Sequence, residues 1–324
     1  MQASNINTLL RRILEVRELV LVFIILFGGA VMGLISPIFL NVSNLKAIFL
    51  GLSVEAIIAA GMTILLVSGG LDMSVGSTMA FSGVIACMGI KAGVPVALAV
   101  LLGIASGSLI GLINGLIIAR WRINPFIVTL GMLSIVRGFV LILANGLTII
   151  NLPKTFTVLG QGSLFGLQYP ILFSVFVIML GDVLLRRSRF FRQNYYIGGN
   201  EKAAILTGIK VKQVKIFNYV LTGTLSAIAG ILMSARLASA SVNIGVGLEL
   251  KVITAAVIGG ASLSGGEGSI AGAFLGSLLM ATLINSLNLL GIDVYWQNVI
   301  TGIILIAAVI LDTVLKQRRE AAAL

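Results

Sequence analysis

Long, uninterrupted apolar runs constrain the fold of this sequence more than any other feature. Only 10% of the 324 residues are charged and 58% are hydrophobic, with a mean hydropathy of +1.13. A soluble domain carries about a quarter charged residues, so too few charges are present here to cover a water-facing surface. The apolar content also excludes a disordered chain. Because the runs are continuous rather than alternating, a helical membrane bundle is expected and a transmembrane β-barrel is not.

A helix that crosses the hydrocarbon core needs roughly 20 apolar residues. The first run, about 19–36, is long for a signal peptide and is interpreted as a retained helix. The nine further predicted helices are about 47–67, 75–90, 94–119, 125–149, 170–185, 216–238, 251–263, 269–290 and 296–315. The pair 251–263 and 269–290 forms either two spans or a re-entrant hairpin. The predicted fold class is therefore an all-α, polytopic bundle of about ten helices, a single membrane domain over residues 1–324.

The positions of the basic residues orient this bundle. With the amino terminus in the cytoplasm, 16 of the 22 Lys and Arg residues fall in four cytoplasmic segments. Eight of them lie in 186–215, the longest of these segments. Only Lys46, Lys91 and Lys154 fall clearly in external loops. An excess of this size is typical of the cytoplasmic side, so an even number of spans with both termini in the cytoplasm is expected. The net charge of +11 is explained in the same way and does not indicate a nucleic-acid partner.

The composition removes several kinds of chemistry. The sequence has no His, the commonest metal ligand and general base, and its single cysteine, Cys87, cannot form an intrachain disulfide. No metal site is predicted, and Cys87 is interpreted as a packing residue. The sequence also lacks the G-x-x-x-x-G-K-[ST] phosphate loop, so it cannot hydrolyse ATP by that route. With no nucleophile–base pair visible, we expect a protein that is not an enzyme.

The segment 186–215 contains a complete signal for one short helix. Asn200 can cap its first N–H groups, and Glu201 favours the positive end of the helix. Gly208 can take the left-handed conformation that closes a helix, and the apolar Ile209 follows it. Such a short helix is not stable alone, so it needs a surface to pack on. It is expected either to lie on the membrane face or to dock a cytoplasmic subunit.

Two Gly/Ser-rich breaks resemble each other and suggest an internal repeat. Residues 68–77 and 260–269 each follow one apolar run and precede another, and they carry Asp72 and Glu267. Repeated halves are common in transporters. Both breaks are expected near the cytoplasmic face. There they can let the chain turn and move, touch a cytoplasmic partner or, less in keeping with their position, bind substrate.

Four blocks in order carry a resemblance to a known family. They lie at 70–77 (GLDMSVGS), 198–209 (GGNEKAAILTGI), 259–268 (GGASLSGGEG) and 285–297, and together they span about 230 residues. The sequence resembles the membrane permease subunit of ribose-type ABC importers, and the hydropathy is similar from end to end.

The resemblance implies a set of partners as well as a fold. These are a second permease copy or homologue, two cytoplasmic ABC ATPase subunits that use ATP and Mg²⁺, and a periplasmic or extracellular solute-binding protein. The chain would sit in the cell (inner) membrane, among lipid, and would bind no cofactor itself. By the family pattern the short helix is a coupling helix that contacts the ATPase. The matching residues are Asn200, Glu201, Ala203, Ala204, Gly208 and Ile209.

The predicted cargo is a monosaccharide such as ribose, although another small solute, for example a branched-chain amino acid, is an alternative. An ion-coupled secondary transporter is a second alternative, but such proteins tend to use intramembrane carboxylates, and only Glu55 lies deep in a predicted span. Amides within spans are candidates either for lining the pathway or for joining helices. They are Asn114, Asn145, Asn285, Asn288 and Gln297.

Two charges are placed well inside predicted spans, Glu55 and Arg137. Charges at such depth usually face the bundle interior and pair. Their predicted depths differ by about 6 Å, which a long Arg side chain can cover. We therefore predict an ion pair between them, the alternative being that each reaches water separately.

Overall fold

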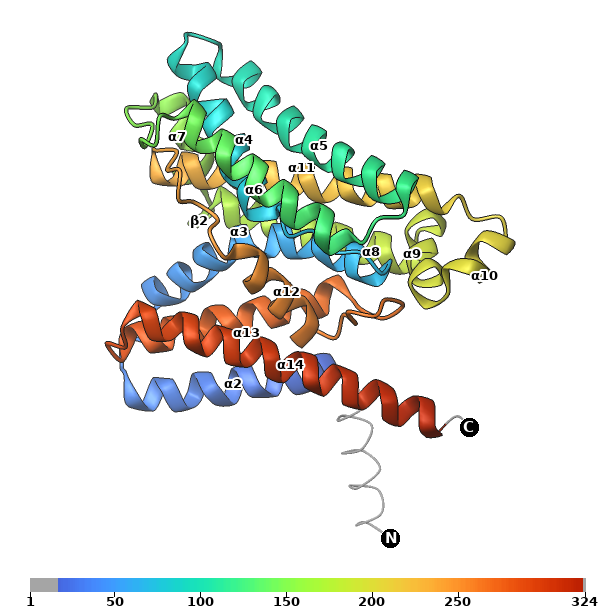
Figure 1. Cartoon of the computed structure of the whole chain (residues 1–324). Helices are drawn as coiled ribbons and strands as arrows, with labels where there is room; N and C mark the ends of the chain where they lie inside the picture. Colours follow the sequence, from blue (N-terminus) through green and yellow to red (C-terminus); the bar gives the residue numbers. More distant parts are fainter. Residues whose placement is uncertain (1–16, 323–324) are drawn as a thin grey trace.

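The computed structural model describes residues 17–322 and is almost entirely helical (Figure 1). Three short helices and a two-residue antiparallel hairpin connect the apolar helices: α7 (Lys154–Gln161), α9 (Arg189–Gly199), α10 (Glu201–Leu206), β1 (Ser163–Leu164) and β2 (Leu167–Gln168). The ten apolar helices are α2 (Arg17–Ile35), α3 (Val42–Val67), α4 (Val75–Lys91), α5 (Val96–Trp121), α6 (Pro125–Leu143), α8 (Tyr169–Arg187), α11 (Val211–Leu237), α12 (Leu248–Ile258), α13 (Ile270–Leu289) and α14 (Val294–Ala322).

Each predicted span corresponds to one of these ten helices, which confirms a polytopic helical membrane protein. Eight helices in the described part of the chain are long and apolar enough to cross a membrane. The other two, α4 with 17 residues and α12 with 11, are shorter. Each of the two adjoins one of the Gly/Ser-rich breaks.

Helix α12 is about half a span. At 1.5 Å per residue, 11 residues cover about 16 Å of a hydrocarbon core that is about 30 Å thick. An irregular segment, 239–247, leads into it and is tied to an outer loop where Ala240 pairs with Ile149. The sequence placed this helix at 251–263, whereas the structure places it at Leu248–Ile258 and ends it at the break.

Helix α3 forms the centre of the bundle. It is the most buried of the eight long helices and packs against α8, α11, α12 and α13. Beside it, α5 crosses α11 through a stripe of glycines, and a methyl group on Gly111 or Gly115 would collide with the α11 backbone at Tyr219 or Ile216. The stripe consists of Gly103, Gly107, Gly111 and Gly115, whose four-residue spacing puts them on one face of α5 and lets the helices pack closely. Cys87 is fully buried in an apolar cluster, so its packing role is confirmed.

The two ends of the bundle carry different short elements (Figure 1). Helix α7 lies at one end, whereas α9, α10 and the carboxyl end of α14 lie at the other. Because 186–215 is the most basic segment, the end with α9 and α10 faces the cytoplasm.

Candidate functional site: the cytoplasmic end of the bundle

The structure forms the short helix that the sequence predicts, and Asn200 caps its start. The Asn200 side chain accepts a hydrogen bond of 3.0 Å from the backbone N–H of Ala203, as an N-cap residue does. Glu201, in the first turn, forms an ion pair of 2.7 Å with Lys215 of α11. Helix α10 is thereby fixed to the start of the long membrane helix that follows it.

A glycine closes the same helix. Gly208 has a φ of +84°, and its N–H donates to the carbonyl of Ile205. The N–H of Ile209 donates to the carbonyl of Ala204, which completes the pair of hydrogen bonds found at glycine-closed helix ends. Ile209 then packs on a small apolar cluster that includes Ala204 and Val214. The closing role predicted for Gly208 and Ile209 is confirmed.

The outer face of α10 is apolar and has no partner within the described residues. Leu206 is 88% exposed and Ile205 is 48% exposed, whereas Ala204 is buried against α9 and α11. A short helix that turns its small residue inward and its large apolar residues outward is suited to insertion into a partner surface.

Helix α9 connects α10 to both Gly/Ser-rich breaks, and the sequence analysis missed it. Gly198, near its end, lies between the backbone of Val67, at the end of α3, and that of Gly266, in the second break. The second break is joined to the end of α3, just before the first break, by a hydrogen bond of 2.9 Å from Gly266 N–H to the Val67 carbonyl. No side chain fits at position 198, so the backbone of α9 is in close contact with the end of α3 and with both breaks. The amphipathic pattern of Arg189–Gly199, with Phe190, Asn194 and Ile197 on one side, is the sequence signal for this helix.

Polar side chains strengthen these contacts. Asn218 of α11 donates to Asn194 of α9 at 2.8 Å and to Ser68 of the first break at 3.2 Å. The Tyr195 hydroxyl donates to the carbonyl of Gly268 in the second break at 2.8 Å. Burial raises the pKa of the Tyr195 phenol, so the hydroxyl keeps its proton and remains a donor at neutral pH. Both breaks therefore lie beside the cytoplasmic helices, as predicted.

The first break is also anchored to α5. Asp72 is 2% exposed and accepts hydrogen bonds from the Ser74 backbone N–H at 2.8 Å and from the Ser74 hydroxyl at 2.6 Å. Asn114, fully buried on α5, donates to the same Ser74 hydroxyl at 3.0 Å. This network fixes a non-helical backbone segment inside the bundle, where protein groups must replace water as partners.

Three of the other four amides proposed for the pathway, Asn285, Asn288 and Gln297, also have hydrogen-bond partners. Asn285 and Asn44 exchange two hydrogen bonds of 2.9 and 3.0 Å and join α13 to α3. Gln297 donates to Asn288 at 2.6 Å and joins α14 to α13. Asn145 lies in the exposed turn after α6, with a φ of +49°. These contacts agree with the helix-joining alternative for all but Asn145, and pathway lining stays a prediction.

The predicted ion pair between Glu55 and Arg137 is wrong: no ion pair joins these two described residues. Arg137 donates to the carbonyls of Val242 and Ile244 at 2.7 and 3.0 Å. Its charge interacts with Glu249, at the start of α12, and the charge of Glu55 interacts with Lys251, two residues further on. The prediction compared only how deep the two residues lie along their own helices. It could not show that a third helix, α12, supplies an opposite charge to each of them.

Comparison with known proteins agrees with this architecture. Residues 44–309 match the model of the family described as "Branched-chain amino acid transport system / permease component". The chain belongs to this permease family. The permease is therefore a multi-pass membrane protein with a transport role.

Individual relatives cover nearly the whole permease. It is 38% identical over 303 residues to the L-arabinose ABC transporter permease protein AraH of Azospirillum brasilense, with 94% of this chain and 89% of the relative covered. It is 40% identical over 284 residues to the ribose import permease protein RbsC of Bacillus subtilis, and this match covers 87% of this chain and 88% of the relative. It is 36% identical over 305 residues to RbsC of Escherichia coli K12, and this match covers 93% of this chain and 94% of the relative. No solved structure matches significantly.

Proposed function

We propose that this permease is the membrane subunit of an ABC importer that moves a monosaccharide of the ribose or arabinose type across the cell (inner) membrane. The single observation that carries the proposal is the capped helix α10, with its exposed apolar face and its backbone link to both breaks. The permease would span the membrane as a single domain over residues 1–324 and act with a second permease copy or homologue.

The energy source would be a separate ATPase that docks on α10. Leu206 would enter a groove on the ATPase, while Asn200 and Gly208 keep the helix short and rigid. ATP and Mg²⁺ would be bound by the ATPase alone. Because Gly198 stands immediately before α10 and against both breaks, movement of the ATPase would reach α3, α4, α12 and α13 together.

The proposed cargo rests on the relatives rather than on a pocket. Proteins named for ribose and arabinose transport are 36–40% identical to this chain over most of its length. The description of the family model supports a second candidate, a branched-chain amino acid. In either case an external solute-binding protein would deliver the cargo to the end of the bundle that carries α7.

Reconstituted vesicles would separate these functions. Vesicles containing the permease, its ATPase and its binding protein should take up labelled ribose or arabinose only when ATP is present on the ATPase side. Uptake of leucine but not of either sugar would exclude the monosaccharide cargo. Sugar uptake by the permease alone, driven by a proton or sodium gradient, would exclude the ABC mechanism in favour of a secondary transporter.

A further inference from the structure

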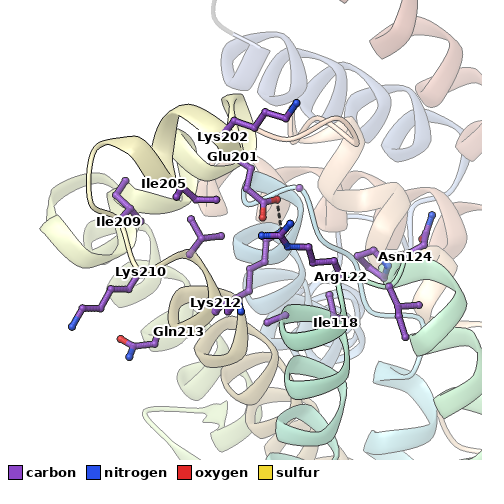
Figure 2. Close-up of a pocket in the computed structure, with 16 residues that line it drawn as sticks. Ile118, Arg122, Asn124, Glu201, Lys202, Ile205, Ile209, Lys210, Lys212 and Gln213 are labelled. Carbon is purple, nitrogen blue, oxygen red and sulfur yellow. Dashed lines mark hydrogen bonds and ion pairs between the residues drawn. The ribbon is translucent and has the colours of Figure 1, made fainter.

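An open hollow of about 980 Å³ lies at the cytoplasmic end of the bundle, between α10, the start of α11 and the corner that joins α5 to α6 (Figure 2). Its lining is mostly cationic and apolar. Five cationic side chains and a single acidic one line it: Arg122, Lys202, Lys210, Lys212, Lys215 and Glu201.

Most of this positive charge is not neutralised. Glu201 is paired with Lys215, which leaves Arg122, Lys202, Lys210 and Lys212 without an acidic partner among the described residues. The first residues of α6 and α11 also line the hollow, and the amino-terminal ends of helices carry partial positive charge. The hollow is therefore built for a ligand with negative charge.

The rest of the lining is apolar. Ile118, Ile123, Ile205 and Ile209 form part of the same wall. An inorganic anion gains nothing from such a wall, whereas a ligand with a charged head and a hydrocarbon body fits both parts.

Exposed apolar side chains adjoin the lining residues Arg122 and Pro125 in the chain. At the corner between α5 and α6, Trp121 is 64% exposed, Phe126 45% and Ile127 65%. Tryptophan and basic residues at the end of a membrane helix are typical of the headgroup level. Arg122 and Pro125, which line the hollow, are thus the direct chain neighbours of exposed apolar residues.

We propose that this hollow binds the headgroup of an anionic phospholipid of the cytoplasmic leaflet. The phosphate lies against Arg122 and Lys212, Lys210 adds positive charge at the rim, where Figure 2 shows its side chain turned outward, and the acyl chains run along Trp121 and Phe126. Basic pockets at the cytoplasmic ends of membrane helices are suited to such headgroups. The proposal depends on the membrane orientation and not on the identity of the transported solute. Because α10 forms one wall, the lipid would also hold the coupling helix in place.

The test is lipid binding by the purified full-length permease, measured by native mass spectrometry with phosphatidylglycerol and phosphatidylcholine as probes. The variant replaces Arg122→Asn, Lys210→Gln and Lys212→Gln together. Asn is chosen at position 122 because φ is +54° there and Asn tolerates that conformation. Each surface cation contributes about fivefold to anionic lipid binding, so the triple variant should bind phosphatidylglycerol roughly a hundredfold more weakly at low salt. Phosphatidylcholine binding should not change.

A matched control removes the same charge elsewhere on the cytoplasmic face: Arg187→Gln, Arg189→Gln and Arg192→Gln, which lie outside the hollow. This control should keep wild-type affinity, and excess inorganic phosphate should not displace the lipid. Equal loss in the control would overturn the proposal in favour of a diffuse charge effect, and displacement by phosphate would reduce the hollow to a simple anion site. If the hollow variant keeps its lipid but no longer holds the ATPase, the hollow is a protein interface instead. None of these measurements requires transport, so they stand apart from the test of the proposed function.

Discussion

Gly198→Ala should separate ATP hydrolysis from transport. The added methyl group would occupy space already filled by the Val67 carbonyl and the Gly266 N–H, so the backbone has to shift. Overfilling a packed site costs about 1–3 kcal/mol. Loss of the Gly266–Val67 hydrogen bond adds about 1 kcal/mol, and Gly→Ala within a helix returns about 0.5–1 kcal/mol. The net destabilisation is about 1–3 kcal/mol, concentrated where α9 meets both breaks.

The neighbouring residue provides a matched control. A methyl group on Gly199 meets no atom within 4 Å, so Gly199→Ala should leave stability unchanged or slightly higher. Both variants would be reconstituted with the ATPase and the binding protein, and the sugar moved per ATP hydrolysed would be measured. We expect this ratio to fall several-fold for Gly198→Ala and to stay at the wild-type value for Gly199→Ala. A folded Gly198→Ala variant with a wild-type ratio would refute transmission through α9.

Three further predictions follow from other parts of the structure. Gly208→Val places a β-branched residue at φ +84°, at a local cost of about 1–3 kcal/mol. The variant should bind the ATPase more weakly while it still inserts into the membrane, and unchanged binding would contradict the closing role of Gly208. Arg137→Glu or Glu249→Arg alone should lower the thermal midpoint because each brings two like charges into interaction between α6 and α12. The double exchange should recover part of the loss, and a double variant no better than the worse single one would exclude the interaction. Phe165, in the hairpin after α7, is 93% exposed, so a Phe165→Cys variant should react with a membrane-impermeant maleimide added from outside the cell. The buried Cys87 should give no background reaction, and labelling of position 165 only after permeabilisation would reverse the orientation.

The sequence predicted the membrane helices well because continuous apolar runs have no other stable environment. The ends of the helices are predicted less accurately, because helices such as α3 and α11 extend several residues into polar sequence. Helix α3 begins at Val42 rather than 47, and α11 begins at Val211 rather than 216. The capped helix Glu201–Leu206 was predictable because both of its end signals are local. Asn200 and Gly208 act on atoms only a few residues away.

The parts that the sequence analysis missed depend on contacts between distant segments. The role of Gly198 exists only because α3 and the second break come together there. The partners of Glu55 and Arg137 lie on α12, about 200 and about 110 residues further along the chain, so spacing alone could not identify them. Helix α9 was hidden because its polar and aromatic residues carry a periodic pattern rather than high hydropathy.

The central claim is that energy enters this permease through α10, and cross-linking tests it most directly. A photo-reactive amino acid in place of Leu206 would be compared with the same residue in place of Phe165, at the opposite end of the bundle, in the assembled complex. We predict that position 206 cross-links to the ATPase subunit and that position 165 does not. An assembled complex in which position 206 gives no ATPase cross-link, or in which position 165 does, would contradict the account.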